Sequence, residues 1–166
     1  MSWDAIGAIS ETIGAIAVVI SLIYVAVQIN KNTNLAKSEY HTTSVSGSAR
    51  FHHWKSANEV NARIYATGMN DFRSLNLHER VILDGVLLDL VLMFRDIQEA
   101  HERGFMELDT YDAWVRFVGA NLGMPGGKMW WEQARGLFLE RVQSAIDTGI
   151  ENTPPLQEFM SIVYEE

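Results

Sequence analysis

The sequence contains no cysteine among its 166 residues. This absence excludes disulfide bonds, thiolate metal sites and cysteine nucleophiles. It also fits a reducing compartment, where disulfides are rare. The segment after residue 30 is long enough to bury one hydrophobic core, so we expect one domain plus an N-terminal segment.

Basic side chains are scarce: 13 Lys and Arg stand against 21 Asp and Glu, which gives a net charge of −8. Residues 64–166 carry eight basic and seventeen acidic side chains, whereas residues 31–63 carry five and two. Nucleic-acid binding needs clustered Lys and Arg, so DNA is excluded as a partner and RNA is not expected. A basic stretch beside a bilayer attracts anionic lipid, and we assign Lys31 and Lys37 to lipid headgroups.

No Lys or Arg precedes the long apolar run near the N-terminus. Residues 12–29 carry no charge, and Glu11 alone interrupts the apolar stretch that begins at Ala5. About twenty helical residues cross a hydrocarbon core roughly 30 Å thick. A secretory signal needs a cationic start, so the run predicts an uncleaved transmembrane anchor over residues 1–30. A long core helix of a soluble bundle is the alternative.

The charges that flank the anchor predict its orientation. Lysines follow it and none precede it, so the positive-inside rule predicts an external N-terminus and a cytoplasmic C-terminal domain. We therefore expect a single-pass protein of the inner (cytoplasmic) membrane.

Small and polar residues converge on one face of the anchor, within an arc of roughly 120°. We call this the small-polar face, and its members are Gly7, Ser10, Glu11, Gly14, Ser21 and Gln28. Small residues spaced four apart let membrane helices approach closely, and an isoleucine stripe lies elsewhere on the helix. We predict that the small-polar face associates with another helix or lines a lumen. Alternatively, Glu11 is an ordinary residue of the headgroup region.

The rest of the chain lacks strand alternation and internal repeats, which predicts an all-α fold. We expect a single transmembrane helix followed by a cytoplasmic antiparallel bundle of about four helices. The expected domains are the anchor (1–30), the bundle (31–153) and a C-terminal tail (154–166).

Local signals predict several helix ends. The bundle would begin with a helix over residues 34–66, and Asn76 with Glu79 resembles a capping box at the start of the next. That second helix is apolar nearly all round and would stop at Gly104. Further helices are expected over residues 109–121 and 128–148; a break at 123–127 would separate them, and the last would close at Gly149.

Four segments carry a resemblance that covers most of the chain: Trp3 to Val19, the Gln-Ile-x-x-Asn-Thr exit at residues 28–33, residues 104–109, and Pro125-Gly-Gly with a following Trp. In these segments the chain resembles a group of small bacterial proteins of unknown function. Those proteins share a hydrophobic N-terminal helix and a helical cytoplasmic part. The resemblance implies this architecture and no activity.

A second resemblance involves Arg95, Asp96 and His101, which match the Arg-x4–6-His pattern of HEPN ribonucleases. In that superfamily the motifs of two bundles meet and cleave RNA by general acid–base and charge-stabilising chemistry. More loosely, the chain is similar to HEPN-like membrane pore subunits associated with CRISPR defence. The spacing also arises by chance, since Arg73 and His78 match it too, and on one helix Arg95 and His101 lie about 120° apart.

Other chemical motifs are weak. His52 and His53 point about 100° apart on a helix and do not form a metal pair. Residues 119–128 are not a phosphate-binding loop, because a helix precedes them and Met129 replaces Ser or Thr. We expect neither cofactor nor metal. The sequence favours a non-enzymatic membrane protein that self-associates, as a ring or pore in the more specific form, or docks on a larger membrane complex. The alternative is a membrane-tethered HEPN-type ribonuclease.

Overall fold

The computed structural model describes residues 3–159, and every regular element among them is a helix. The all-α fold class is therefore confirmed. The chain forms two compact units, Met1–Glu39 and Tyr40–Glu166, which we call the N-terminal and C-terminal units. Helix α1 (Trp3–Ser56) begins in the first unit and ends in the second. The predicted boundary between anchor and bundle at residue 30 marks where the chain would leave the bilayer, so it stays a prediction.

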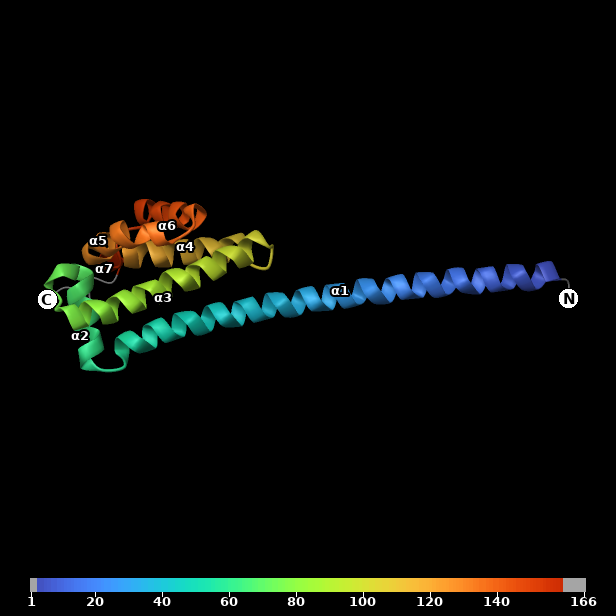
Figure 1. The fold of residues 1–166 in the computed structure, drawn as a ribbon, viewed down its shortest axis with the longest axis horizontal. Helices are drawn as coiled ribbons and strands as arrows, with labels where there is room; N and C mark the ends of the chain where they lie inside the picture. Colours follow the sequence, from blue (N-terminus) through green and yellow to red (C-terminus); the bar gives the residue numbers. More distant parts are fainter. Residues whose placement is uncertain (1–2, 160–166) are drawn as a thin grey trace. The chain divides into compact units, whose positions relative to one another are not determined.

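Helices shorter than α1 follow it in the C-terminal unit (Figure 1). In chain order they are α2 (Glu59–Asn70), η1 (Phe72–Ser74), α3 (Leu77–Glu102), α4 (Leu108–Leu122), α5 (Pro125–Ala134), η2 (Arg135–Leu137), α6 (Glu140–Asn152) and α7 (Leu156–Phe159). Helix α4 packs against both α3 and α6, and α5 packs against α2.

The two ends of α3 follow the sequence signals closely. The Asn76 side chain accepts from the Glu79 amide at 3.0 Å, and the Glu79 carboxylate accepts from the Asn76 amide at 3.1 Å. Arg63 of α2 donates to the same carboxylate at 2.7 Å, which lowers the pKa of Glu79. At the other end Gly104 has a φ of 73°, a conformation that favours glycine at the residue after a helix. The predicted capping box and stop are confirmed.

Helix α3 lies at the centre of the core. Its buried side chains pack with apolar side chains of α1, α2, α4, α5 and α6, as expected for a helix that is apolar on most sides. The largest fully buried side chains of the unit include Ile64, Met69, Leu83, Leu87, Leu90 and Phe94. Val81 and Leu92, also in α3, are exposed. The C-terminal unit thus has a hydrophobic core of its own.

Two close backbone approaches hold the helices together. A Cβ atom at Gly119 of α4 would lie 2.3 Å from the carbonyl carbon of Gly149 in α6. A Cβ atom at Gly126 of α5 would lie 1.9 Å from the carbonyl oxygen of Gly68 in α2. Glycine is therefore required at both positions, because nearby backbone atoms occupy the space that a side chain would need.

The predicted helix over residues 34–66 is wrong in its boundaries. Helix α1 runs without interruption to Ser56, and α2 starts at Glu59. Asn58 separates them because its extended backbone and its side chain, which accepts from the Asn61 amide at 2.9 Å, begin a new helix.

The predicted helix over residues 128–148 is also wrong. Helix α5 starts earlier, at Pro125, so the predicted break shortens to residues 123 and 124. The chain then turns through η2, and the Phe138 ring stacks on Trp131 with centroids 5.8 Å apart. Burial of this aromatic side chain favours the turn over a continuous helix. Helix α6 then continues to Asn152, so Gly149 lies inside it and does not end it.

Candidate functional site

The most informative feature of the N-terminal unit is its uncovered apolar helix. The segment Glu11–Tyr40 is 30 residues long, and none of its most apolar 18-residue window is buried. Among the described residues it is the one helix long and apolar enough to cross a membrane, by length and composition. Exposing so much apolar surface to water is energetically unfavourable. The segment Glu11–Tyr40 is therefore the first candidate for a functional site.

The glycines of the small-polar face leave open space on α1. A Cβ atom at Gly7 or Gly14 would meet nothing within 4 Å. The Glu11 side chain is exposed, and the side chain of Ser10 lies outside the described residues. This face therefore offers a surface on which a second helix could approach the α1 backbone closely.

The polar side chains farther along the small-polar face find partners within α1. The Ser21 hydroxyl donates to the Ala17 carbonyl at 2.8 Å, and the Gln28 side-chain amide donates to the Tyr24 hydroxyl at 3.0 Å. Such local hydrogen bonds lower the cost of placing a polar group in hydrocarbon. Lys31 and Lys37, which we assigned to lipid headgroups, both have exposed side chains.

The structure does not join the residues of the Arg-x4–6-His motif. Arg95 pairs with the neighbouring Asp96, whose carboxylate accepts two hydrogen bonds at 2.8 and 3.0 Å. The His101 ring stacks on Tyr111 with centroids 4.4 Å apart, and its Nδ1 lies 3.1 Å from the Met106 carbonyl oxygen. Arg95 and His101 thus make separate contacts at the end of α3, and no hydrogen bond joins them within the described chain.

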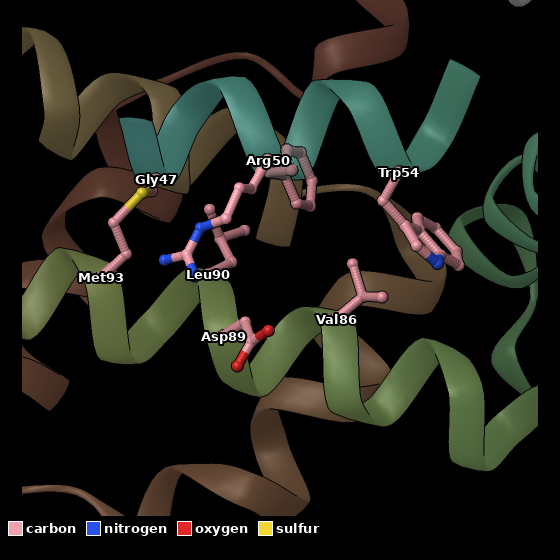
Figure 2. Close-up of a pocket in the computed structure, with 8 residues that line it drawn as sticks. Gly47, Arg50, Trp54, Val86, Asp89, Leu90 and Met93 are labelled. Atoms are coloured by element: carbon pink, nitrogen blue, oxygen red, sulfur yellow. The ribbon is translucent and has the colours of Figure 1, made fainter. Parts of the chain in front are cut away.

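A groove of about 210 Å³ lies between the last turns of α1 and the middle of α3, inside the C-terminal unit (Figure 2). Figure 2 shows Arg50 extending from α1 toward α3, where Asp89 stands on the facing wall. No ion pair joins these two side chains in the described part of the chain. Apolar residues form the remaining walls: Phe51, Trp54, Val86, Leu90 and Met93, with Gly47 at one end.

The groove is lined mainly by apolar side chains. Its charged groups are one guanidinium, Arg50, and one carboxylate, Asp89, and this carboxylate is the group of the lining that could act as a base or nucleophile. Within residues 3–159 no group of three His, Cys, Asp or Glu side chains could hold a metal ion. The adjacent His52 and His53 are both exposed.

His52 lies in a partly apolar environment that affects its titration. Its ring lies 5.8 Å from the Phe51 ring and 5.6 Å from the Phe117 ring, centroid to centroid. Although the residue is largely exposed, partial burial of its ring and, to a smaller extent, the Lys55 ammonium lower the pKa of His52 from its ordinary value of 6.5. Burial also lowers the pKa of Lys55, which lies 4.7 Å from the Tyr65 ring centroid.

The lowered pKa of His52 predicts that acid destabilises the C-terminal unit. Below pH 6.5 the unfolded chain binds a proton at His52 more readily than the folded chain, so the unfolding free energy should fall as pH decreases from neutral to about 5. Denaturant titrations of the full chain across this range should show a smaller fall in a His52→Gln variant. His53→Gln is the control and should keep the wild-type dependence. An unchanged dependence in His52→Gln would contradict the assignment.

No protein-family model matches the chain, and neither a curated protein nor a solved structure matches it.

Sequence reasoning missed two hollows of the C-terminal unit, the groove above and a cavity beside Trp130. Arg50 and Asp89 are 39 positions apart, and no spacing rule connects residues on two helices whose packing is unknown. The one available signal was that Asp89 interrupts an apolar helix.

Proposed function

We propose that this chain is a single-pass membrane protein that self-associates through the small-polar face of α1 and has no catalytic activity. One observation carries the proposal: the most apolar 18-residue window of Glu11–Tyr40 is uncovered, whereas the C-terminal unit has a buried core of its own. A helix with that composition is stable in hydrocarbon, where its backbone groups are already hydrogen-bonded. The N-terminal unit is then the anchor, and the C-terminal unit is the part that the anchor localises.

Self-association is supported by the placement of small residues, Gly7, Gly14 and Ser21, on one face of α1. In membranes, helices associate through close packing and interhelical hydrogen bonds, because the lipid removes the hydrophobic drive between them. A solitary anchor has no use for glycines and polar side chains collected on one face. A ring or pore is the more specific form of this proposal, and docking on a larger membrane complex is the other form.

The charge pattern supports an external N-terminus and a cytoplasmic C-terminal unit in the inner membrane. Lys31 and Lys37 follow the anchor, and no Lys or Arg precedes it. The ribonuclease alternative stays a sequence prediction, because Arg95 and His101 make separate contacts.

The absence of native cysteine allows a direct test with single-cysteine variants. Trp3→Cys is exposed near the start of α1, and Ala57→Cys is exposed in the turn before α2. In bacterial spheroplasts, a membrane-impermeant maleimide should label Trp3→Cys at once, and Ala57→Cys only after lysis. Both variants should sediment with membranes and resist alkaline extraction.

Three outcomes would contradict parts of the proposal. Release of the chain into the soluble fraction would remove the membrane anchor. Loss of the N-terminal segment from the mature chain would identify a cleaved signal. Labelling of Ala57→Cys before lysis would reverse the orientation.

A further inference from the structure

A second hollow in the C-terminal unit is built differently from the groove of Figure 2. It has a volume of about 410 Å³ and lies among η1, the first half of α3, and the α5–η2 segment. This volume lies within the range of small-molecule sites, which is roughly 300–1,000 Å³. We call it the Trp130 cavity, and its lining includes Phe72, Arg73, Arg80, Asp84 and Trp130. All of these residues belong to one unit, so the cavity does not depend on the anchor.

The arginines of the Trp130 cavity lack acidic partners among residues 3–159. Within this part of the chain, five of the nine arginines form ion pairs with Asp or Glu: Arg63, Arg95, Arg103, Arg135 and Arg141. Arg73 and Arg80 form none within the described chain, although they lie in an acidic protein. Two guanidinium groups without an ion-pair partner therefore line one cavity.

The one carboxylate of the cavity is already engaged. Asp84 Oδ1 accepts a hydrogen bond from the indole N–H of Trp130 at 2.7 Å. Trp130 is 5% exposed, so this bond joins α3 to a nearly buried ring of α5. It holds Asp84 toward Trp130, and no ion pair joins Asp84 to Arg80, one helical turn earlier. The lining therefore carries two guanidinium groups and one carboxylate, a net charge of +1, and one oxygen of that carboxylate accepts from the Trp130 indole.

The remaining lining is partly apolar. Phe72 and Met129 are half-buried, and Leu137 of η2 is 76% exposed at the edge of the cavity. Guanidinium groups bind carboxylates and phosphates with two parallel hydrogen bonds, whereas apolar walls favour a ligand that removes carbon from water. The two features together describe an amphiphilic ligand.

We propose that the Trp130 cavity binds a small organic anion in which a phosphate or carboxylate group is attached to an apolar body. Arg73 and Arg80 hold the anionic group, and Phe72, Met129 and Leu137 contact the apolar part. Trp130 and Asp84 form the floor and keep α3 and α5 in position. The proposal goes beyond the membrane role and is independent of it.

Calorimetric titration of the full chain in phosphatidylcholine nanodiscs tests the proposal, with empty nanodiscs as the blank. Four water-soluble probes separate the contributions: phenyl phosphate, benzoate, inorganic phosphate and benzyl alcohol. At least one organic anion should bind about tenfold more tightly than both inorganic phosphate and benzyl alcohol. If phenyl phosphate binds and benzoate does not, the cavity recognises a phosphate group. If both bind, the cavity accepts carboxylate and phosphate groups alike.

Three variants with exposed side chains serve as tests, and a fourth is the control. Arg73→Gln and Arg80→Gln should each weaken the organic anion about fivefold or more. Leu137→Gln should weaken the organic anions and leave inorganic phosphate unchanged. Arg116 is an exposed residue of α4 that also forms no ion pair with the residues that the structure describes, and Arg116→Gln should bind as the wild type does.

Either of two results would overturn the proposal. The first is a wild-type chain that binds neither organic anion at millimolar concentration, or binds them no better than benzyl alcohol. The second is an equal loss of affinity for the organic anion in the Arg73→Gln, Arg80→Gln and Arg116→Gln variants.

Discussion

A Gly119→Ala variant should lose about 3 kcal/mol of unfolding free energy, the upper end of the usual cost of overpacking. The added Cβ atom would lie 2.3 Å from the carbonyl carbon of Gly149, 2.4 Å from its oxygen and 2.8 Å from its Cα. These are backbone atoms of α6, which cannot rotate away as a flexible side chain can. The substitution therefore forces α4 and α6 apart and opens the core around them.

Gly85→Ala is the matched control, because the same substitution should raise the unfolding free energy at that position. Gly85 lies inside α3, is exposed, and has nothing within 4 Å of the position of a Cβ atom. Alanine in an exposed helix interior should add about 0.5–1 kcal/mol. Denaturant unfolding of the full chain, followed by tryptophan fluorescence, measures both changes. If Gly119→Ala is as stable as the wild type, the close approach of α4 and α6 is wrong.

Sequence reasoning predicted those structural features that depend on neighbouring residues. The capping box of Asn76 and Glu79 closes within four residues, and the stop at Gly104 needs one residue with a positive φ. Both are confirmed, because the residues that decide them are adjacent in the chain. The apolar N-terminal helix belongs to the same group, since length and hydropathy alone identify it.

The features that were mispredicted depend on contacts between distant residues. Gly149 was predicted to end a helix, which is the common role of glycine after apolar periodicity. In the structure it lies inside α6 and gives α4 room at Gly119, thirty positions earlier. The turn at residues 135–139 likewise depends on Phe138 packing against Trp131. Glycine at a helix crossing and glycine at a helix end are alike in sequence, so only the packing distinguishes them.

The two candidate sites differ in the same way: one depends on residues that are near in sequence, and the other depends on contacts between distant residues. The small-polar face could be identified from sequence because a regular helix fixes the direction of each side chain. The Trp130 cavity could not, since Arg80 and Trp130 are fifty positions apart and meet only through the packing of α3 with α5. Asp84 interrupts an otherwise apolar stretch of α3, and its hydrogen bond with Trp130 supplies the reason for a carboxylate there.

The second large effect is expected in the anchor, where a Gly14→Ile, Ser21→Leu double variant should weaken self-association about tenfold or more. The two residues are seven positions apart, so they lie on one face of α1 about 10 Å from each other. A side chain at Gly14 would fill space that is open in the isolated chain. A larger side chain at Ser21 would also cover the backbone at a second point of the same face. Sedimentation equilibrium in detergent micelles measures the change in association.

The control for this variant places two substitutions, also seven positions apart, in the isoleucine stripe of α1. An Ile13→Leu, Ile20→Leu double variant keeps the volume and hydropathy of the helix, and it should associate as the wild type does. Since both double variants remain apolar, both should stay in the membrane fraction, which separates loss of association from loss of anchoring. Equal association of the two would mean that the small-polar face does not mediate contact between copies. A monomeric wild type would remove self-association altogether and leave docking on a different membrane protein as the role of that face.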